Sequence, residues 1–92
     1  MNAAMTDAAH AVPDATFLNF LSGLASQALM QFGEIPNPLS GVRTANLPYA
    51  RYTLQLVEVL AAKTAGNRTA EEDEYLTTLL ADLRRRLQVA GG

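Results

Sequence analysis

The stretch that decides the fold is TAEEDEYLTTLLADLRRRL, residues 69–87. Thr69 and Glu72 have the spacing of a capping box, in which the threonine hydroxyl accepts a backbone N–H and the glutamate reaches back to the capping residue. Leucines then recur in steps of four, three and four, which places them on one narrow seam of a helix. They are Leu76, Leu80, Leu83 and Leu87. The pattern predicts an outer helix over about 70–89.

The segment before this helix predicts another one, over about 47–65. Asn46 can cap its N-terminus, Pro48 is tolerated in its first turn, and Gly66-Asn67 is a typical stop. Its apolar arc is wider than half the circumference, which is more than one neighbouring helix can cover. Only Gly66 to Arg68 separate the two helices, so they are expected to form an antiparallel hairpin.

A further helix is predicted over about 15–32, with Asp14 as its N-cap and Gly33 as its end. One side is apolar, and the other side carries no charged residue. That uncharged side consists of Asn19, Ser22, Gly23, Ser26 and Gln27. A solvated helix face usually carries Lys, Arg or Glu, so another helix is expected to lie against this side. Residues 1–13 are predicted to be a disordered tail, and residues 14–90 a single helical domain.

The three helical patterns predict an all-α, three-helix chain, and the composition favours a dimeric helical bundle. A chain of 92 residues has a small core, it has no cysteine for disulfides, and only 17% of its residues are charged. Self-association is the remaining common way to stabilise a core of this size, which predicts a homodimer. No transmembrane span is expected, because the uncharged run 15–33 includes Asn, Ser and Gln residues. The absence of cysteine and of a targeting signal favours the cytoplasm.

The chain offers little for catalysis. Its one histidine, His10, falls in the predicted tail, where nothing can hold it beside a nucleophile. The acidic residues 71–74 point around the whole helix, so they favour helix capping over metal binding. We therefore expect no catalytic residue, no metal site and no cofactor.

The loop that covers about residues 34–45 is the most credible binding element for an unidentified protein partner. The candidate residues are Glu34, Ile35, Pro36, Leu39 and Val42. Its prolines reduce the entropy lost on docking, and its apolar side chains offer anchors. The other interpretation is that the same residues fold back over the end of their own bundle.

Arginines suggest an alternative function, binding of RNA or another polyanion. The candidates are Arg43, Arg68, Arg84, Arg85 and Arg86. A net charge of −2 and the lack of an aromatic platform oppose it, so nucleic acid is not an expected partner. Arg86 is four residues after Asp82, a spacing that predicts an ion pair on the helix surface.

Several short motifs, taken together, resemble a family of short bacterial proteins called domain of unknown function 1844. The residues that carry the resemblance are Gly33-Glu34-Ile35-Pro36, Pro38, Leu47, Ala50-Arg51, Lys63-Thr64, Gly66-Asn67, Thr69, Glu72 and Leu83-Arg84. It covers about residues 17–87 and departs from the family pattern at Gln55 and Arg68. The resemblance implies a small helical bacterial protein with no assigned activity. With the residues themselves, it favours a non-enzymatic interaction or structural protein, an adaptor or accessory subunit that acts as a homo-oligomer.

Overall fold

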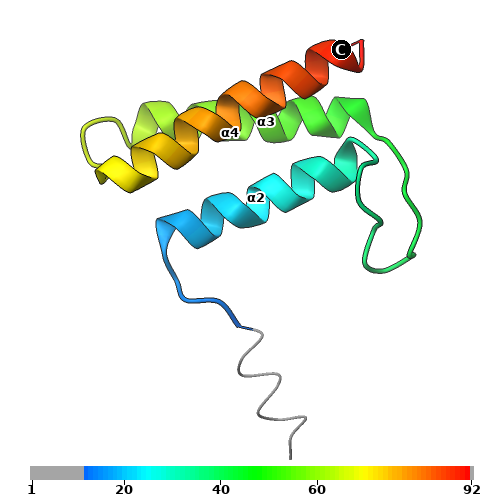
Figure 1. The fold of residues 1–92 in the computed structure, drawn as a ribbon, viewed down its shortest axis with the longest axis horizontal. Coiled ribbons are helices and arrows are strands. Elements are labelled where there is room, and N and C mark those ends of the chain that lie inside the picture. Colours follow the sequence, from blue (N-terminus) through cyan, green and yellow to red (C-terminus); the bar gives the residue numbers. More distant parts are fainter. Residues whose placement is uncertain (1–11, 92) are drawn as a thin grey trace, which may run out of the picture.

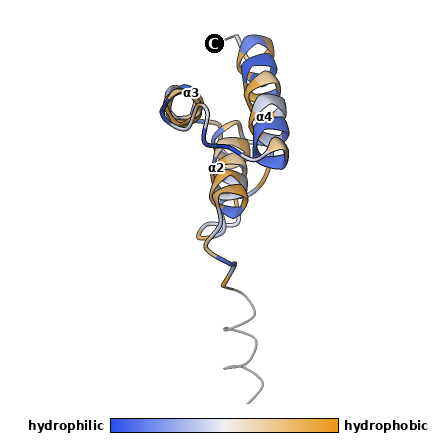
Figure 2. Ribbon diagram, turned by 90° about the vertical axis from the view of Figure 1, so that its left-hand side faces the viewer, coloured by the Kyte–Doolittle hydropathy of each residue, from blue (hydrophilic) through white to orange (hydrophobic). Residues whose placement is uncertain are grey.

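The computed structural model describes residues 12–91, and most of them lie in three α-helices. The helices are α2 (Phe17–Gln31), α3 (Leu47–Lys63) and α4 (Ala70–Val89). The chain reverses direction between α2 and α3 and again between α3 and α4 (Figure 1). Viewed close to end-on, the three helices lie at the corners of a triangle (Figure 2). The predicted all-α fold is confirmed, including the antiparallel hairpin of α3 and α4.

The start of α2 differs from the prediction. Thr16, not Asp14, is the N-cap, and its hydroxyl accepts the backbone N–H of Asn19 at 3.0 Å. The Asp14 carbonyl instead accepts the backbone N–H of Thr16 and the side-chain amide of Asn19. Because the capping residue lies two positions later, the helix begins at Phe17 and not at residue 15.

The other helix ends follow their local sequence. The Asn46 side chain accepts the N–H of Tyr49, and Thr69 and Glu72 form the complete capping box predicted from their spacing. The second helix ends at Lys63, two residues before the predicted end, and α4 has the predicted bounds.

The core lies between the three helices and is made of aliphatic side chains from each of them. Its buried members are Leu21 and Ala28 of α2, Ala50, Leu54 and Val57 of α3, and Leu76, Leu79 and Leu83 of α4. Thr53 is also fully buried, and its hydroxyl donates a hydrogen bond to Gln31 Oε1 at 2.6 Å. This polar pair joins the C-terminal end of α2 to α3.

The uncharged side of α2, which was expected to lie against another helix, is exposed in the single chain. Asn19, Ser22, Ser26 and Gln27 are all open to solvent. Within residues 12–91, no helix combines the length and the apolar character needed to cross a membrane. The predicted tail, residues 1–13, falls almost wholly outside the described residues.

Candidate functional site

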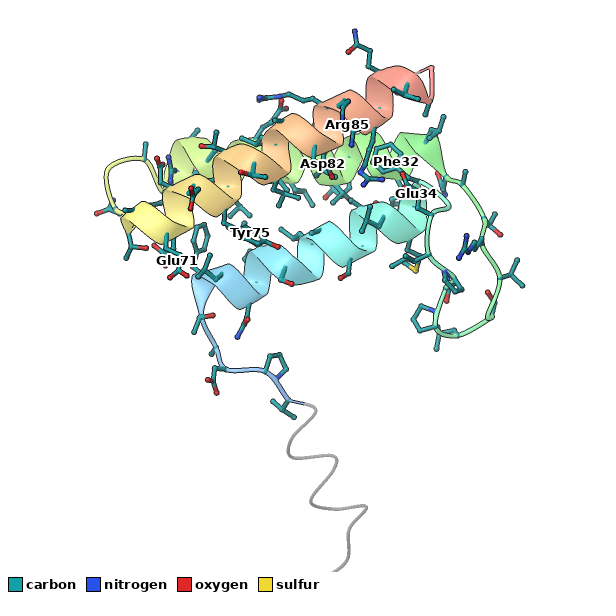
Figure 3. The ribbon with its side chains drawn as sticks, in the orientation of Figure 1. Phe32, Glu34, Glu71, Tyr75, Asp82 and Arg85 are labelled. Carbon is teal, nitrogen blue, oxygen red and sulfur yellow. The ribbon has the colours of Figure 1, made fainter. Side chains whose placement is uncertain are left out.

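The loop between α2 and α3 is fixed at both of its ends. After Gly33, the N–H of Glu34 donates to the carbonyl of Leu29, and the Glu34 carboxylate forms an ion pair with Arg86 of α4. At the other end, the N–H of Asn46 donates to the carbonyl of Gln31 at 2.6 Å. Figure 3 shows Glu34 beside Phe32, close to the part of α4 that carries Asp82 and Arg85. Glu34, a predicted partner-binding residue, is therefore engaged within its own chain.

The tip of this loop is closed by its own hydrogen bonds. The N–H of Asn37 donates to the carbonyl of Val42 at 2.9 Å, and the Asn37 side chain accepts the N–H of Leu39 at 2.8 Å. Leu39 is 96% exposed and Val42 is 55% exposed, whereas Ile35 is half-buried. The interpretation that the loop covers the end of its own bundle is therefore wrong for Leu39 and Val42. Those two residues and Pro36 remain available to a partner.

An open pocket of about 400 Å³ lies between this loop and the adjoining ends of α2 and α3. It is lined by Met30, Gln31, Asn37, Ser40, Thr44, Asn46 and Tyr49. The carbonyl oxygens of the Asn37, Asn46 and Gln31 side chains already accept hydrogen bonds from the protein. The lining carries no charged group, and its polar side chains close the loop tip, cap α3 and join α2 to α3.

Arg68 has a structural position at the turn between α3 and α4. Its Nη1 donates to the carbonyl of Ala61 at 2.8 Å and to the Thr64 hydroxyl at 2.9 Å. The other side of its guanidinium binds the Asp73 carboxylate at 2.8 Å. Only 16% of the side chain is exposed. It thus satisfies the Ala61 carbonyl near the end of α3 and fixes the start of α4.

The three successive arginines near the end of α4 also pair with carboxylates. Arg84 contacts Glu58 of α3 at 3.1 Å, and Arg85 contacts Asp82 at 2.7 Å. Arg86 binds Asp82 at 2.8 Å, which confirms the predicted pair, and it also binds Glu34. The hydrogen bond from Arg86 lowers the pKa of Asp82, and the Glu34 and Asp82 carboxylates raise the pKa of Arg86.

The five candidate arginines do not form one basic patch. Arg68 precedes α4 and Arg84 to Arg86 lie near its other end, about 24 Å away along the helix axis. Four of the five pair with carboxylates, and Arg43 lies exposed in the loop. Because a polyanion would have to compete with these ion pairs, the geometry gives the RNA-binding alternative no support.

Within the acidic cluster of α4, residues 71–74, Glu72 has the helix-capping role that was predicted for the cluster. Glu72 completes the capping box and Asp73 pairs with Arg68. Glu71 and Glu74 are exposed. Among the residues that the structure describes, no three His, Cys, Asp or Glu side chains come together in a way that could hold a metal ion. His10 lies outside the described residues.

A row of exposed apolar residues runs along the side of α3 that faces away from α4. It consists of Tyr49, Tyr52, Leu56 and Val59. The first two and the last are 58%, 51% and 53% exposed, and Leu56 is half-buried. Their spacing of three, four and three residues is that of a coiled-coil seam. The rings of Tyr49 and Tyr52 already contact each other edge to face, with centroids 6.4 Å apart.

A second row with the same spacing lies beside it on α2. This row consists of Phe20, Gly23, Gln27 and Met30. Met30 and Tyr49 line the same pocket, and Gln31 bonds to Thr53, so the two rows share one side of the molecule. We call these eight residues the α2–α3 outer face. No Asp, Glu or Arg belongs to it, and α2 has no charged residue at all.

The distribution of hydropathy agrees with this description. Figure 2 shows α2 largely in apolar and intermediate colours, whereas α4 has many hydrophilic residues on its ribbon. The sequence had indicated the wide apolar arc of the second helix. It did not show that the arc divides into a core stripe and an exposed row, because that division depends on where the other two helices lie.

Fold and surfaces together define a small three-helix protein whose most distinctive feature is an exposed, uncharged helical face. The chain belongs to the family described as Domain of unknown function (DUF1844), which matches residues 14–88. This match confirms the resemblance seen in the sequence motifs. No curated protein and no solved structure gives a match.

Proposed function

We propose that this chain is a non-enzymatic interaction protein that acts as a homo-oligomer, as an adaptor or accessory subunit. The observation that carries the proposal is the α2–α3 outer face. Phe20, Tyr49 and Tyr52 each expose about half of their surface there, the two tyrosine rings contact each other, and none of the eight residues of the face is charged. Adjoining apolar side chains on a small protein are typical of a protein–protein contact.

The charged residues support the same proposal in another way. Glu34, Asp73 and Glu58 form ion pairs that tie elements together, Asp82 pairs with arginines of its own helix, and Glu72 completes a helix cap. These are structural uses of groups that could otherwise do acid–base chemistry. The exposed Leu39 and Val42 offer an adaptor a second contact, with a protein partner, at the tip of a loop that is held by its own hydrogen bonds.

We place this protein in the bacterial cytoplasm. A chain without cysteine suits a reducing compartment, and the bacterial assignment rests on the resemblance to the family.

The test is the molar mass in solution, measured by light scattering over a hundredfold range of protein concentration. We expect wild-type protein to have twice the mass of one chain. Gln27→Glu places a charge in the α2–α3 outer face with almost no change of shape, so it should shift the mass toward one chain. Burying that charge would be unfavourable without a partner of opposite sign.

Gln88→Glu is the matched control, because it makes the same change at an exposed position of α4, away from the α2–α3 outer face. It should keep the mass of the wild-type protein. A wild-type chain that stays monomeric at high micromolar concentration would remove the basis of the proposal.

A further inference from the structure

We infer that the α3 helices of two copies pack antiparallel against each other along the row Tyr49, Tyr52, Leu56 and Val59, about a two-fold axis between Tyr52 and Leu56. The inference rests on the proposed function, since it specifies the face and the symmetry of the homo-oligomer. With α2 beside α3 in each copy, the contact would be a four-helix bundle.

The spacing of the row makes it complementary to itself. In an antiparallel pair about a centre at position 54, Tyr49 lies opposite Val59 of the second copy, and Tyr52 lies opposite its Leu56. Each aromatic ring therefore meets an aliphatic side chain, and no ring has to stack face to face on its own copy. Such an isologous contact closes after two chains, so it forms a dimer and not a filament.

The Tyr49 and Tyr52 rings are already positioned for this contact. They meet edge to face at an interplanar angle of 88°, so less side-chain freedom is lost on association than for two independent side chains. The buried Thr53, one position along, bonds to Gln31 and fixes α3 against α2 behind the row. A rigid apolar surface of this kind suits a partner that is equally well ordered.

The size of the face fits a small dimer. Two adjacent helices of 15 and 17 residues form a face about 20 Å wide and 25 Å long. Its projected area is about 500 Å², and the relief of the side chains raises the accessible area toward the roughly 600–1,000 Å² that each partner contributes to a standard interface.

The lack of charged residues on the α2–α3 outer face favours a second copy of the chain as its partner. Arg51 and Glu58 occupy positions of α3 outside the row, Glu58 pairs with Arg84 of α4, and Lys63 lies beyond the end of the row. A partner with charged groups at its centre would lose their hydration and gain no ion pair in return. A second copy brings a face of the same size that is equally apolar and equally free of charge.

Disulfide trapping tests the geometry, because the chain has no cysteine of its own. Tyr49→Cys and Val59→Cys variants are purified separately, one with a mass tag, then mixed, exchanged and oxidised. About 10 residues separate 49 from 59, so two copies of residue 49 would lie about 15 Å apart along the antiparallel helices and could not be bridged. We expect the mixed 49–59 disulfide to exceed either self-linked product at least tenfold.

A second pair, Tyr52→Cys with Leu56→Cys, should give the same result nearer the centre. Tyr49→Cys mixed with Tyr52→Cys is the matched control and should not link. In this arrangement Tyr49 lies opposite Val59 of the second copy, so it is about 10 Å along the axis from that copy's residue 52. Light scattering before oxidation shows whether each variant is still dimeric, and one dimeric pair is enough for the test.

The outcomes separate the two proposals. Dimeric variants that give no mixed disulfide, or equal amounts of all products, overturn the antiparallel α3 contact but leave the homo-oligomer intact. Wild-type protein that is monomeric at every concentration overturns the homo-oligomer itself.

Discussion

Gly33 is the residue on which the path of the chain after α2 depends. Its φ is +78°, and it is followed by the hydrogen bond from Glu34 to the Leu29 carbonyl, while its own N–H donates to the carbonyl of Met30. This pair of bonds is a Schellman motif, which turns the chain out of a helix through a left-handed residue. A Cβ at Gly33 would lie only 3.1 Å from the backbone nitrogen of Ala45. The glycine therefore permits both the turn and the close approach of the returning loop.

Replacing Gly33 by alanine should destabilise the protein more than the same change at Gly66. Both glycines have a positive φ, which costs an L-residue about 1–2 kcal/mol, but a Cβ at Gly66 would meet nothing within 4 Å. We expect Gly66→Ala to lower the free energy of unfolding by about 1 kcal/mol, and Gly33→Ala to lower it by about 1 kcal/mol more. Urea unfolding of the two variants measures the difference. Equal decreases in the free energy of unfolding would show that the contact with Ala45 does not contribute to stability.

Ion pairs tie the C-terminal half of α4 to distant parts of the chain. Asp82 accepts hydrogen bonds from Arg85 and Arg86 within the helix, and Arg86 also binds Glu34 at the exit of α2. The ion-pair cluster thus connects α4 to the loop that carries Leu39. Glu58 and Arg84 add a separate link between α3 and α4.

Acid should reduce the stability that this ion-pair cluster contributes, and the direction of the effect follows from the pKa of Asp82. The hydrogen bond from Arg86 lowers the pKa of Asp82 below its ordinary value of 3.8. A lowered pKa stabilises the folded state above the unfolded pKa, and that contribution is lost as the pH falls through the folded pKa. We therefore expect Asp82→Asn to cost about 0.5–1 kcal/mol at pH 7, a figure that allows for solvent screening of a side chain that is one-third exposed.

The measurement is the free energy of urea unfolding of wild type and Asp82→Asn at several pH values. The difference between them should shrink from about pH 5 downward, and it should also shrink at pH 7 in 1 M salt, where surface ion pairs are screened. A difference that stays constant down to pH 2 would mean that the Asp82 carboxylate does not stabilise the folded state through these pairs.

The elements that local sequence decides were predictable, and those that depend on packing were not. The capping box and the leucine seam fixed α4, because both act within a few residues of each other. Asp14 and Thr16 are both good caps, and nothing in the local pattern chose between them. The pair of Glu34 with Arg86 spans 52 positions, so only the folded chain could show that a predicted binding residue is already engaged.

The same reasoning applies to the candidate surfaces. The sequence showed too much apolar surface on the second helix, and the structure resolves it into a core stripe around Val57 and an exposed row around Leu56. Leu39 was open to two interpretations, and its exposure follows from the hydrogen bonds of Asn37, which close the loop tip away from the bundle. Arg68 was a polyanion candidate, but its contacts with Ala61 and Asp73 make it a structural residue.

At the scale of the whole molecule, folding and association should be one process. A domain of this size buries a smaller fraction of its surface than a larger one, so its stability alone is marginal. The core provides eight buried apolar residues, while three aromatic rings remain half exposed on the α2–α3 outer face. If a second copy covers that face, the free energy of unfolding includes the free energy of association and depends on protein concentration.

The thermal midpoint of wild-type protein should therefore rise with concentration. Each tenfold increase adds about 1.4 kcal/mol per dimer, which corresponds to roughly 3–6 °C for a unit of this size. Calorimetry between 5 µM and 500 µM should show a rise of about 6–12 °C over two decades. Gln27→Glu should have a midpoint that is lower and nearly constant over the same range, because it unfolds as a single chain. Gln88→Glu should show the same rise with concentration as the wild type. A constant midpoint for wild type would mean that the three helices are stable alone and that their exposed face serves some other contact.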